Sequence, residues 1–342
     1  MQVKPSDSSG RVSVVIVNYY TEEHVLRAVT SLSNQLNVTE IIIVDNGSST
    51  GLLRTLRDES ENIYLIEPGG NLGFARGSNM GAEKARSEFL FFLNPDATVD
   101  PECINRLIEG YRKRPGIVGP TIHAAANDTH NLGATMNHFG MSKSLNGLKS
   151  PLYVSGCALF TSRTVFEEIG RFDSRYFLFV EDAELCWRAL LAGYDVHVVA
   201  SANVHHEGGV SAEGGYFNAG KRYHTTTLRI ALRERNTITM MIASAPWYWI
   251  PIVLPALIVR AWLMAISGIL LGRFDLALSI IQGLLWNIMQ LPNTLERRRS
   301  LVRKIEGEHE SSRRFVHRPI LLIMLLQSGV PRISGTSDSD GI

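Results

Sequence analysis

An unbroken apolar run, Phe89 to Leu93, is followed directly by Asn94, Pro95 and Asp96. Such a run is typical of a strand buried in a sheet that is covered on both faces. Because a proline nitrogen cannot donate a hydrogen bond to a neighbouring strand, the strand must end before Pro95. Asp96 is therefore expected just beyond the carboxyl end of a central strand, where ligands bind in open α/β sheets, and its carboxylate is suited to hold a hard cation against a phosphate. An ordinary Asn-Pro-Asp turn is the competing interpretation.

Two further polar residues follow β-branched apolar runs near the start of the chain. Val12 to Val17 ends at Asn18, and Ile41 to Val44 ends at Asp45. Helical patterns between the runs predict right-handed βαβ units and a parallel sheet. Asn18, Asp45 and Asp96 are then expected to share one edge of the sheet. No Gly-x-Gly-x-x-Gly or Gly-Lys-Ser loop is present, so a divalent metal on Asp96 is the simplest way to hold a phosphate there.

A glycine-rich stretch at residues 71–81 leads into a helix expected from about Ala75 to Ala85. Its small residues permit close approach of the backbone to a ligand and of the helix to the sheet. Arg76 could reach an anionic group near the helix N-terminus, where the backbone amides also favour negative charge. The alternative is a tightly packed helix with a solvated arginine.

The second half of the chain adds a candidate general base. Residues 153–161 are predicted to form a strand interrupted by Gly156, which suggests that another group approaches the backbone closely. Asp182 precedes an amphipathic helix, predicted at residues 183–192, and its carboxylate could take the proton of an attacking hydroxyl. Glu181 is the competing base, and capping of the helix N-terminus is the non-catalytic interpretation of Asp182. Arg188 is expected to order neighbouring carboxylates.

A histidine pair, His205 and His206, follows a strand predicted at residues 194–199. A neutral imidazole beside Asp96 would complete a mixed oxygen and nitrogen site suited to Mn²⁺ or Mg²⁺. A pair of surface histidines in a flexible loop is the alternative.

Length, charge and cysteine content limit the number of domains, the kinds of partner and the cellular compartment that the chain can have. The 342 residues leave room for one large or two medium domains, and a net charge of +1 gives no sign of a nucleic-acid partner. The three widely spaced cysteines predict neither a disulfide framework nor a zinc site, which fits a reducing compartment. Residues 1–10 and 331–342 are expected to be disordered, and the first eleven residues do not resemble a signal peptide.

The chain becomes strongly apolar after about Ser244. Residues 247–271 contain a single charge, Arg260, and a second apolar run covers residues 276–291, with a third, shorter run at residues 319–326. Basic residues on both flanks place both ends on the cytoplasmic side of a membrane. Residues 245–330 are therefore predicted to be a membrane-associated helical region that spans the bilayer, re-enters it or lies in its interface. Because Arg260 is unfavourable in lipid, a helical pair buried against the preceding domain is the alternative.

Seven motifs occur in an order that resembles the family 2 glycosyltransferases. They are VIVNY at 15–19, VDNGSS at 44–49, NLGFA at 71–75, FLNPD at 92–96, SGCAL at 155–159, EDAELCWR at 181–188 and HEGGVS at 206–211. The chain is most similar to bacterial rhamnosyltransferase-like members, over residues 11–240. The resemblance implies an α/β GT-A fold, with a mixed, mostly parallel sheet and helices on both faces, followed by a C-terminal apolar helical segment. Residues 11–120 would form the nucleotide-binding half and residues 121–240 the acceptor half.

The resemblance also assigns roles by position. It implies that Asn18, Tyr19 and Glu22 border the nucleoside and that Asp45 hydrogen-bonds the base. The other donor-site residues it implies are Asn46, Arg76, Asn94 and Gly156.

The remaining assignments concern the reacting groups. Asp96 would bind the metal together with His206, and Asn94 replaces the first carboxylate of the family's usual Asp-x-Asp. Asp182 matches the catalytic base.

The implied activity is transfer of a sugar with inversion, assisted by Mn²⁺ or Mg²⁺. The donor would be a dTDP- or UDP-sugar, with rhamnose favoured, and the acceptor a hydroxyl of a glycan or polyprenyl-linked substrate. The enzyme would work at the cytoplasmic face of the cell membrane in cell-surface polysaccharide synthesis. An inactive, membrane-anchored module that binds sugar nucleotides is the alternative, while a nucleotidyltransferase would need a basic glycine-rich loop after the first strand.

Overall fold

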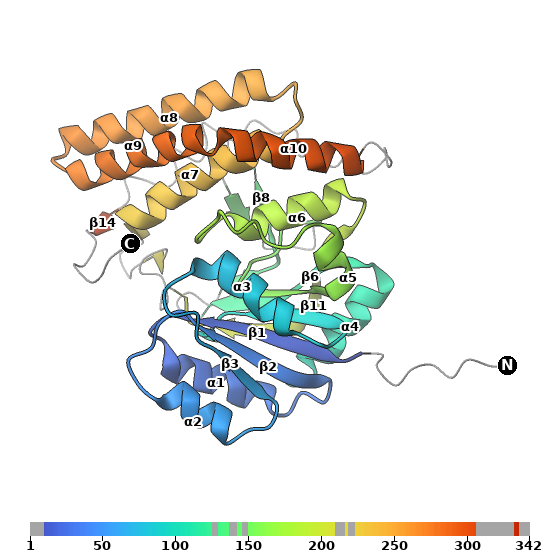
Figure 1. Cartoon of the computed structure of the whole chain (residues 1–342). Coiled ribbons are helices and arrows are strands. Elements are labelled where there is room, and N and C mark those ends of the chain that lie inside the picture. The colour runs from blue at the N-terminus through green and yellow to red at the C-terminus, as the bar shows by residue number, and fades with distance from the viewer. Residues whose placement is uncertain are drawn as a thin grey trace. The chain divides into compact units, whose positions relative to one another are not determined.

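The computed structural model describes residues 10–124, 129–136, 142–145, 150–208, 216–217, 223–305 and 332–334 (Figure 1). The chain forms two compact units, one of residues 1–135 and 144–211 and the other of residues 136–143 and 212–342. The first unit thus ends at Ser211, whereas the sequence suggested a domain that continues to residue 240. Most of the ends expected to be disordered, and the apolar run at 319–326, lie outside the described residues.

The first unit alternates strands and helices, as the sequence predicted. Its first half contains β1 (Val12–Asn18), α1 (Glu22–Leu32), β2 (Val38–Asp45), α2 (Leu52–Asp58), β3 (Ile63–Ile66), α3 (Gly73–Lys84), β4 (Phe89–Leu93) and β5 (Ala97–Val99). The second half contains α4 (Cys103–Lys113), β6 (Gly116–Ala124), β7 (Thr129–Asn131), β10 (Ala158–Ser162), α5 (Arg163–Glu168), α6 (Glu181–Leu191) and β11 (Asp195–His206), and the short strands β8 (Ala134–Met136) and β9 (Ser142–Ser144) lie at the unit boundary.

These strands build a mixed sheet in the order β3-β2-β1-β4-β10-β6-β11-β5, with β7 paired to β6. Strands β3, β2, β1 and β4 pair in parallel with one another, which confirms the predicted βαβ units. Strand β10 runs antiparallel to both β4 and β6, and β5 runs antiparallel to β11. The order places the ends of β1, β2 and β4 at one edge, as the sequence predicted.

Helices cover both faces of this sheet (Figure 1). Val14 and Ile16 of β1 pack in one core with residues of α1, α2 and α4. The alternate residues of β1 face α3, where a Cβ on Gly81 would lie only 2.4 Å from Val15. Glycine at this position therefore allows α3 to pack directly on the sheet.

Two predicted elements differ from the structure. Only Ala158–Ser162 of the strand expected at 153–161 is extended in the sheet, because Ser155 to Ala158 forms a turn in which the Ala158 amide donates to the Ser155 carbonyl at 3.2 Å. The strand expected to end at Val199 continues as β11 to His206, so His206 lies at a strand end and not in a flexible loop. After an irregularity between Val199 and Asn203, β11 resumes pairing with β6 and also pairs with β5.

The second unit is mainly helical. It contains β12 (Tyr216–Phe217), β13 (Tyr223–Thr226), α7 (Thr227–Ser244), α8 (Ile250–Leu270), α9 (Phe274–Met289), α10 (Leu291–Ile305) and β14 (Arg332–Ser334). Strand β14 pairs with β13, so three residues of the tail expected to be disordered are extended. Among the described residues, α8 alone is long and apolar enough to cross a membrane, while α9 and the first part of α10 pass the same test only as a pair bent by 58°.

Candidate active site

Asn18 and Asp45 lie side by side at the ends of β1 and β2. The Asn18 Nδ2 donates to Asp45 Oδ1 at 2.9 Å and to the Gly47 carbonyl at 2.9 Å. The other Asp45 oxygen accepts a hydrogen bond from the Ser48 hydroxyl at 2.7 Å. Both Asn18 and Asp45 are buried, so this pair holds the loop after β2 in a defined shape.

The same loop packs against two tyrosine rings. Tyr19 and Tyr20 lie edge to face with centroids 4.8 Å apart, and a Cβ on Gly47 would come within 3.1–3.2 Å of both rings. Next to Gly47, Asn46 donates from Nδ2 to the Gly73 carbonyl at 3.1 Å, while its buried Oδ1 has no hydrogen-bond partner in the described part of the chain. A buried acceptor without a partner is unfavourable, so Asn46 Oδ1 is available to a donor group on a ligand.

Glu22, in the first turn of α1, is the support for this loop. Its Oε1 accepts hydrogen bonds from the amides of Ser49 at 2.5 Å and Thr50 at 3.0 Å. Burial acts to raise the pKa of Glu22, but the amide hydrogen bonds outweigh it and lower the pKa from its usual value. Glu22 therefore holds the loop after β2, which is the same loop that Asn18 and Asp45 hold at its other end.

Asn94, Asp96 and His206 come together at the next strand end. His206 Nε2 lies 3.1 Å from Asp96 Oδ1 and 3.4 Å from Asn94 Nδ2. Asp96 is only 4 % exposed, and its carbonyl accepts the Glu207 amide at 3.0 Å, which fixes the end of β11 against the loop after β4. The pairing of His206 with Asp96 that the sequence suggested is thus present.

The Asp96–His206 pair has the spacing of two neighbouring ligands of one ion. Two ligands at right angles, each about 2.1 Å from Mg²⁺ or Mn²⁺, would be roughly 3 Å apart, and the observed separation is 3.1 Å. Within the described residues, no group of three or more His, Cys, Asp or Glu side chains is arranged to hold a metal.

Asp182 is held near this strand end by a backbone amide. Its Oδ2 accepts the Gly156 amide at 2.9 Å, and its Oδ1 accepts the Ala183 amide at 2.7 Å. The alternative interpretation, that Asp182 caps the helix, does not hold, because α6 begins at Glu181 and Val180 is the capping residue. Gly156 does approach a side chain closely, since a Cβ there would lie 3.2 Å from the Asp182 Cβ.

Cys157 connects the two carboxylates. Its carbonyl accepts the Asn94 amide at 2.8 Å, and it follows the residue that binds Asp182. Burial raises the pKa of the Cys157 thiol to about 12; a hydrogen bond with Ser155 opposes the shift, and the negative charges of Asp96 and Asp182 add to it. The Gly156–Cys157 segment therefore joins Asp182, which Gly156 binds, to the loop of Asn94 and Asp96, which Cys157 binds. The sequence analysis did not recognise Cys157 as part of the site.

Glu181, the competing base, faces the interior of the first unit. It is 5 % exposed, and its Oε2 has no hydrogen-bond partner among the described residues. Burial and the charge of Asp182 raise the pKa of Glu181 to about 8. Glu181 is therefore protonated at neutral pH and cannot act as the base there, whereas Asp182 is partly exposed.

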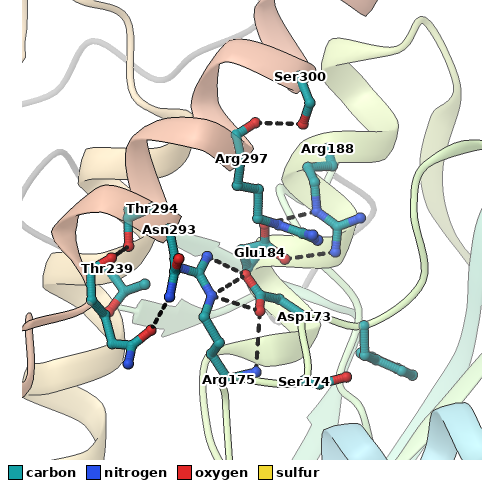
Figure 2. Close-up of polar contacts among 12 residues, drawn as sticks. Asp173, Ser174, Arg175, Glu184, Arg188, Thr239, Asn293, Thr294, Arg297 and Ser300 are labelled. Carbon is teal, nitrogen blue, oxygen red and sulfur yellow. Dashed lines mark hydrogen bonds and ion pairs between the residues drawn. The ribbon is translucent and has the colours of Figure 1, made fainter.

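A buried ion pair supports the helix that carries Asp182. Arg188 donates to Glu184 through Nε at 2.7 Å and Nη2 at 2.6 Å, and both side chains are 0 % exposed (Figure 2). Arg188 also donates to the carbonyls of Ile169 and Arg171, so it ties α6 to the segment after α5. In that segment Arg175 pairs with Asp173 at 2.6 Å (Figure 2). The prediction that Arg188 orders a neighbouring carboxylate is confirmed.

Arg76 is exposed in the first turn of α3. None of the hydrogen bonds or ion pairs among the described residues links it to the other predicted site residues. The first residue of α3, Gly73, nevertheless packs tightly against the loop at Phe177. Its φ is +75°, and a Cβ there would lie 2.2 Å from the Phe177 carbonyl oxygen, so only glycine fits at this position.

The chain resembles known proteins in the region that carries these groups. Residues 13–170 match the profile of the family described as "Glycosyl transferase family 2". The chain carries a family 2 glycosyltransferase domain. The sequence prediction of this family is thereby confirmed.

Relatives extend the similarity beyond this domain. The chain is 30 % identical over 192 residues to the low-salt glycan biosynthesis hexosyltransferase Agl10 of Haloferax volcanii, covering 52 % of this chain and 61 % of the relative. It is 26 % identical over 231 residues to the N-acetylglucosaminyl-diphospho-decaprenol L-rhamnosyltransferase of Mycobacterium tuberculosis, covering 57 % of this chain and 75 % of the relative. The chain thus spans about three fifths of the length of the archaeal relative.

The crystal structure of GalNAc-T7 with UDP, GalNAc and Mn²⁺ shares the fold of this glycosyltransferase domain. The TM-score is 0.55 at 16 % identity, over 70 % of this chain and 48 % of that protein. The predicted GT-A fold, with its mixed sheet, is confirmed.

Proposed function

We propose that the protein transfers a sugar from a nucleoside diphosphate donor to a hydroxyl group, with inversion at the anomeric carbon. The observation that carries this proposal is that the Gly156–Cys157 segment brings Asp182 together with the loop that holds Asp96 and His206. An in-line displacement needs negative charge to be neutralised on the leaving side and a base on the attacking side. The family of the domain supports the same reaction.

In the proposed reaction, Asp182 takes the proton of the acceptor hydroxyl as its oxygen bonds to the anomeric carbon. The bond from that carbon to the diphosphate oxygen breaks, and the electron pair leaves on the diphosphate. The Gly156 amide, 2.9 Å from Asp182 Oδ2, orients the carboxylate and leaves its remaining lone pairs for the hydroxyl.

Asp96 and His206 are proposed to hold a divalent cation, with Asn94 beside them. Such a cation would neutralise the charge that develops on the diphosphate. Their 3.1 Å separation supports this assignment.

The nucleoside is proposed to lie at the ends of β1 and β2. Tyr19 offers a ring face, Asp45 and the unpartnered Asn46 Oδ1 offer acceptors, and Glu22 holds the loop in place. Arg76 is proposed to contact the donor's phosphates from the start of α3.

The favoured donor sugar is rhamnose, as dTDP- or UDP-rhamnose, and the favoured acceptor is a polyprenyl-linked glycan. The similarity to the N-acetylglucosaminyl-diphospho-decaprenol L-rhamnosyltransferase of Mycobacterium tuberculosis supports both. We further propose that the apolar helices hold the enzyme at the cytoplasmic face of the cell membrane, in cell-surface polysaccharide synthesis.

The direct test is release of nucleoside diphosphate by the purified full-length protein. A panel of dTDP- and UDP-sugars would be supplied with Mn²⁺ or Mg²⁺ and a polyprenyl-diphospho-N-acetylglucosamine acceptor. Acceptor-dependent release with one donor is expected. Nucleotide binding by calorimetry without turnover on any donor would instead support an inactive binding module.

A further inference from the structure

The second unit exposes apolar side chains along one side of each of two neighbouring helices. On α8 these side chains are Ile252, Val259, Leu263, Ile266 and Leu270, and on α9 they are Phe274, Leu278, Leu285, Ile288 and Met289. Apart from the adjacent pair Ile288 and Met289, consecutive members of each set are three, four or seven residues apart, which places each set on one side of its helix. Exposed apolar surface of this extent marks an interaction site.

The opposite side of α8 is packed and carries its only charge. Arg260, at the midpoint of α8, donates through Nε and Nη2 to Glu234 Oε2 of α7 at 3.0 and 2.8 Å. Small residues near it, Ala261 and Ala265, are buried in a cluster with residues of α7 and α9. The charge is therefore paired with α7, although the Arg260 side chain remains 26 % exposed.

Polar contacts fix α7 along α9 as well. Near one end, the Thr227 hydroxyl donates to Asp275 at 2.7 Å, and near the other, the Thr239 hydroxyl donates to Asn287 at 2.8 Å. Both pairs join residues 48 positions apart, so α7 and α9 run parallel with a constant offset. The three helices are therefore one assembly, and α8 and α9 cannot enter a bilayer without α7.

The packing of α7 against α8 and α9 makes it unfavourable for α8 and α9 to cross a membrane and favours an orientation along its surface. If α8 crossed, its midpoint Arg260 would lie at the bilayer centre together with Glu234 and its neighbours Arg233 and Arg235. Charged residues at that depth are highly unfavourable. In addition, α9 has 16 residues and a length of about 24 Å, which is shorter than the roughly 30 Å hydrocarbon core.

We propose that α8 and α9 bind a phospholipid bilayer while lying flat in its interface, with α7 on the water side and no segment between residues 246 and 290 crossing. The exposed Trp247, Tyr248 and Trp262 suit the headgroup level, where aromatic residues concentrate. This proposal rests on the membrane location proposed above, but not on the transfer reaction.

The depth of α8 along its length tests the proposal. Single cysteines would replace Ile252, Val259, Leu263, Ile266 and Leu270 in the full chain, each would carry a nitroxide label, and depth would be measured in phosphatidylethanolamine–phosphatidylglycerol vesicles. The three native cysteines are buried, and labelling of the unaltered protein measures their background. Leu36→Cys, at a leucine that is 89 % exposed in the first unit, is the matched aqueous control.

A flat helix gives similar, shallow depths of about 5–10 Å at all five positions. A depth that rises steadily along α8, or that is greatest at Leu263 and falls toward both ends, would overturn the proposal. So would the absence of vesicle binding together with a stable dimer, since the apolar stripes would then be covered by a second copy.

A second variant separates membrane binding from catalysis. Leu263→Glu combined with Ile266→Glu is expected to weaken vesicle binding at least about tenfold, because both charges would enter the interface. Donor-dependent release of nucleoside diphosphate in detergent should remain. Loss of that release in the unaltered protein would instead count against the proposed transfer reaction alone.

Discussion

Replacing Glu181 with glutamine should change how the stability of the protein depends on pH. Glu181 is buried, its Oε2 has no hydrogen-bond partner among the described residues, and its folded-state pKa is about 8. In the unfolded chain the same carboxyl has a pKa near 4.3. The folded state therefore retains a proton that the unfolded state releases, and the stability present below about pH 4.3 is lost progressively as the pH rises toward 8.

The size of the effect follows from this difference. Each pH unit between the two pKa values lowers the free energy of unfolding by roughly 1 kcal/mol, so a rise from pH 5.5 to 7.5 costs on the order of 2–3 kcal/mol at this one group. Glutamine has nearly the same shape and does not titrate. Compared with the Glu181→Gln variant, the unaltered protein should therefore lose stability on the order of 2–3 kcal/mol over this interval.

Urea unfolding of both proteins at several pH values, in the same mild detergent and followed by circular dichroism, measures this difference. Glu23→Gln, which removes an exposed carboxylate on α1, is the matched control and should give a curve parallel to that of the unaltered protein. A constant difference between Glu181→Gln and the unaltered protein from pH 5.5 to 7.5 would refute the assignment, because Glu181 would then be ionised in the folded state.

Three further predictions concern the site and its support. Asp182→Asn should lower the rate of sugar transfer by about 10²–10⁴-fold while calorimetry shows unchanged donor binding, and unchanged turnover would exclude Asp182 as the base. His206→Ala should weaken Mn²⁺ binding in the presence of nucleoside diphosphate at least about tenfold, as measured by electron paramagnetic resonance; equal Mn²⁺ affinity would place the cation elsewhere. Arg188→Met should destabilise the protein by about 3–5 kcal/mol in urea unfolding, because it leaves Glu184 buried without its cation, and the double variant Arg188→Met/Glu184→Leu should recover much of that loss.

Strands β1, β2 and β4 could be predicted from the sequence because each is a buried apolar run that ends at a polar residue. This signal is local, and it placed Asn18, Asp45 and Asp96 at one edge before any contact was known. The pairing of His206 with Asp96 was also expected, but the strand that positions His206 was not. The end of that strand, β11, pairs with β5, and the three residues of β5 are too few to show the alternation that predicts a strand.

The supporting contacts of the site could not be predicted in the same way. Gly156 was expected inside a strand, but its amide donates a hydrogen bond to the side chain of Asp182 and not to a neighbouring strand. Because Asp182 lies 26 residues later in the chain, no local pattern could show this contact. The sequence likewise revealed that Arg260 is a charge in an apolar helix, but not that Glu234 neutralises it. Such pairs are determined by how helices pack, and no local pattern of either helix specifies them.

The constant offset between α7 and α9 has a consequence for how this protein can be altered. An insertion or deletion between the two contacts in either helix would leave only one of the Thr227–Asp275 and Thr239–Asn287 pairs in register, unless the other helix changed by the same number of residues. In α8 the requirements are a cation that faces Glu234 and small residues where Ala261 and Ala265 pack against the other two helices. Residues 246–272 could therefore be exchanged between homologues that keep these three positions, and such chimaeras would test which exposed side chains of α8 the protein needs.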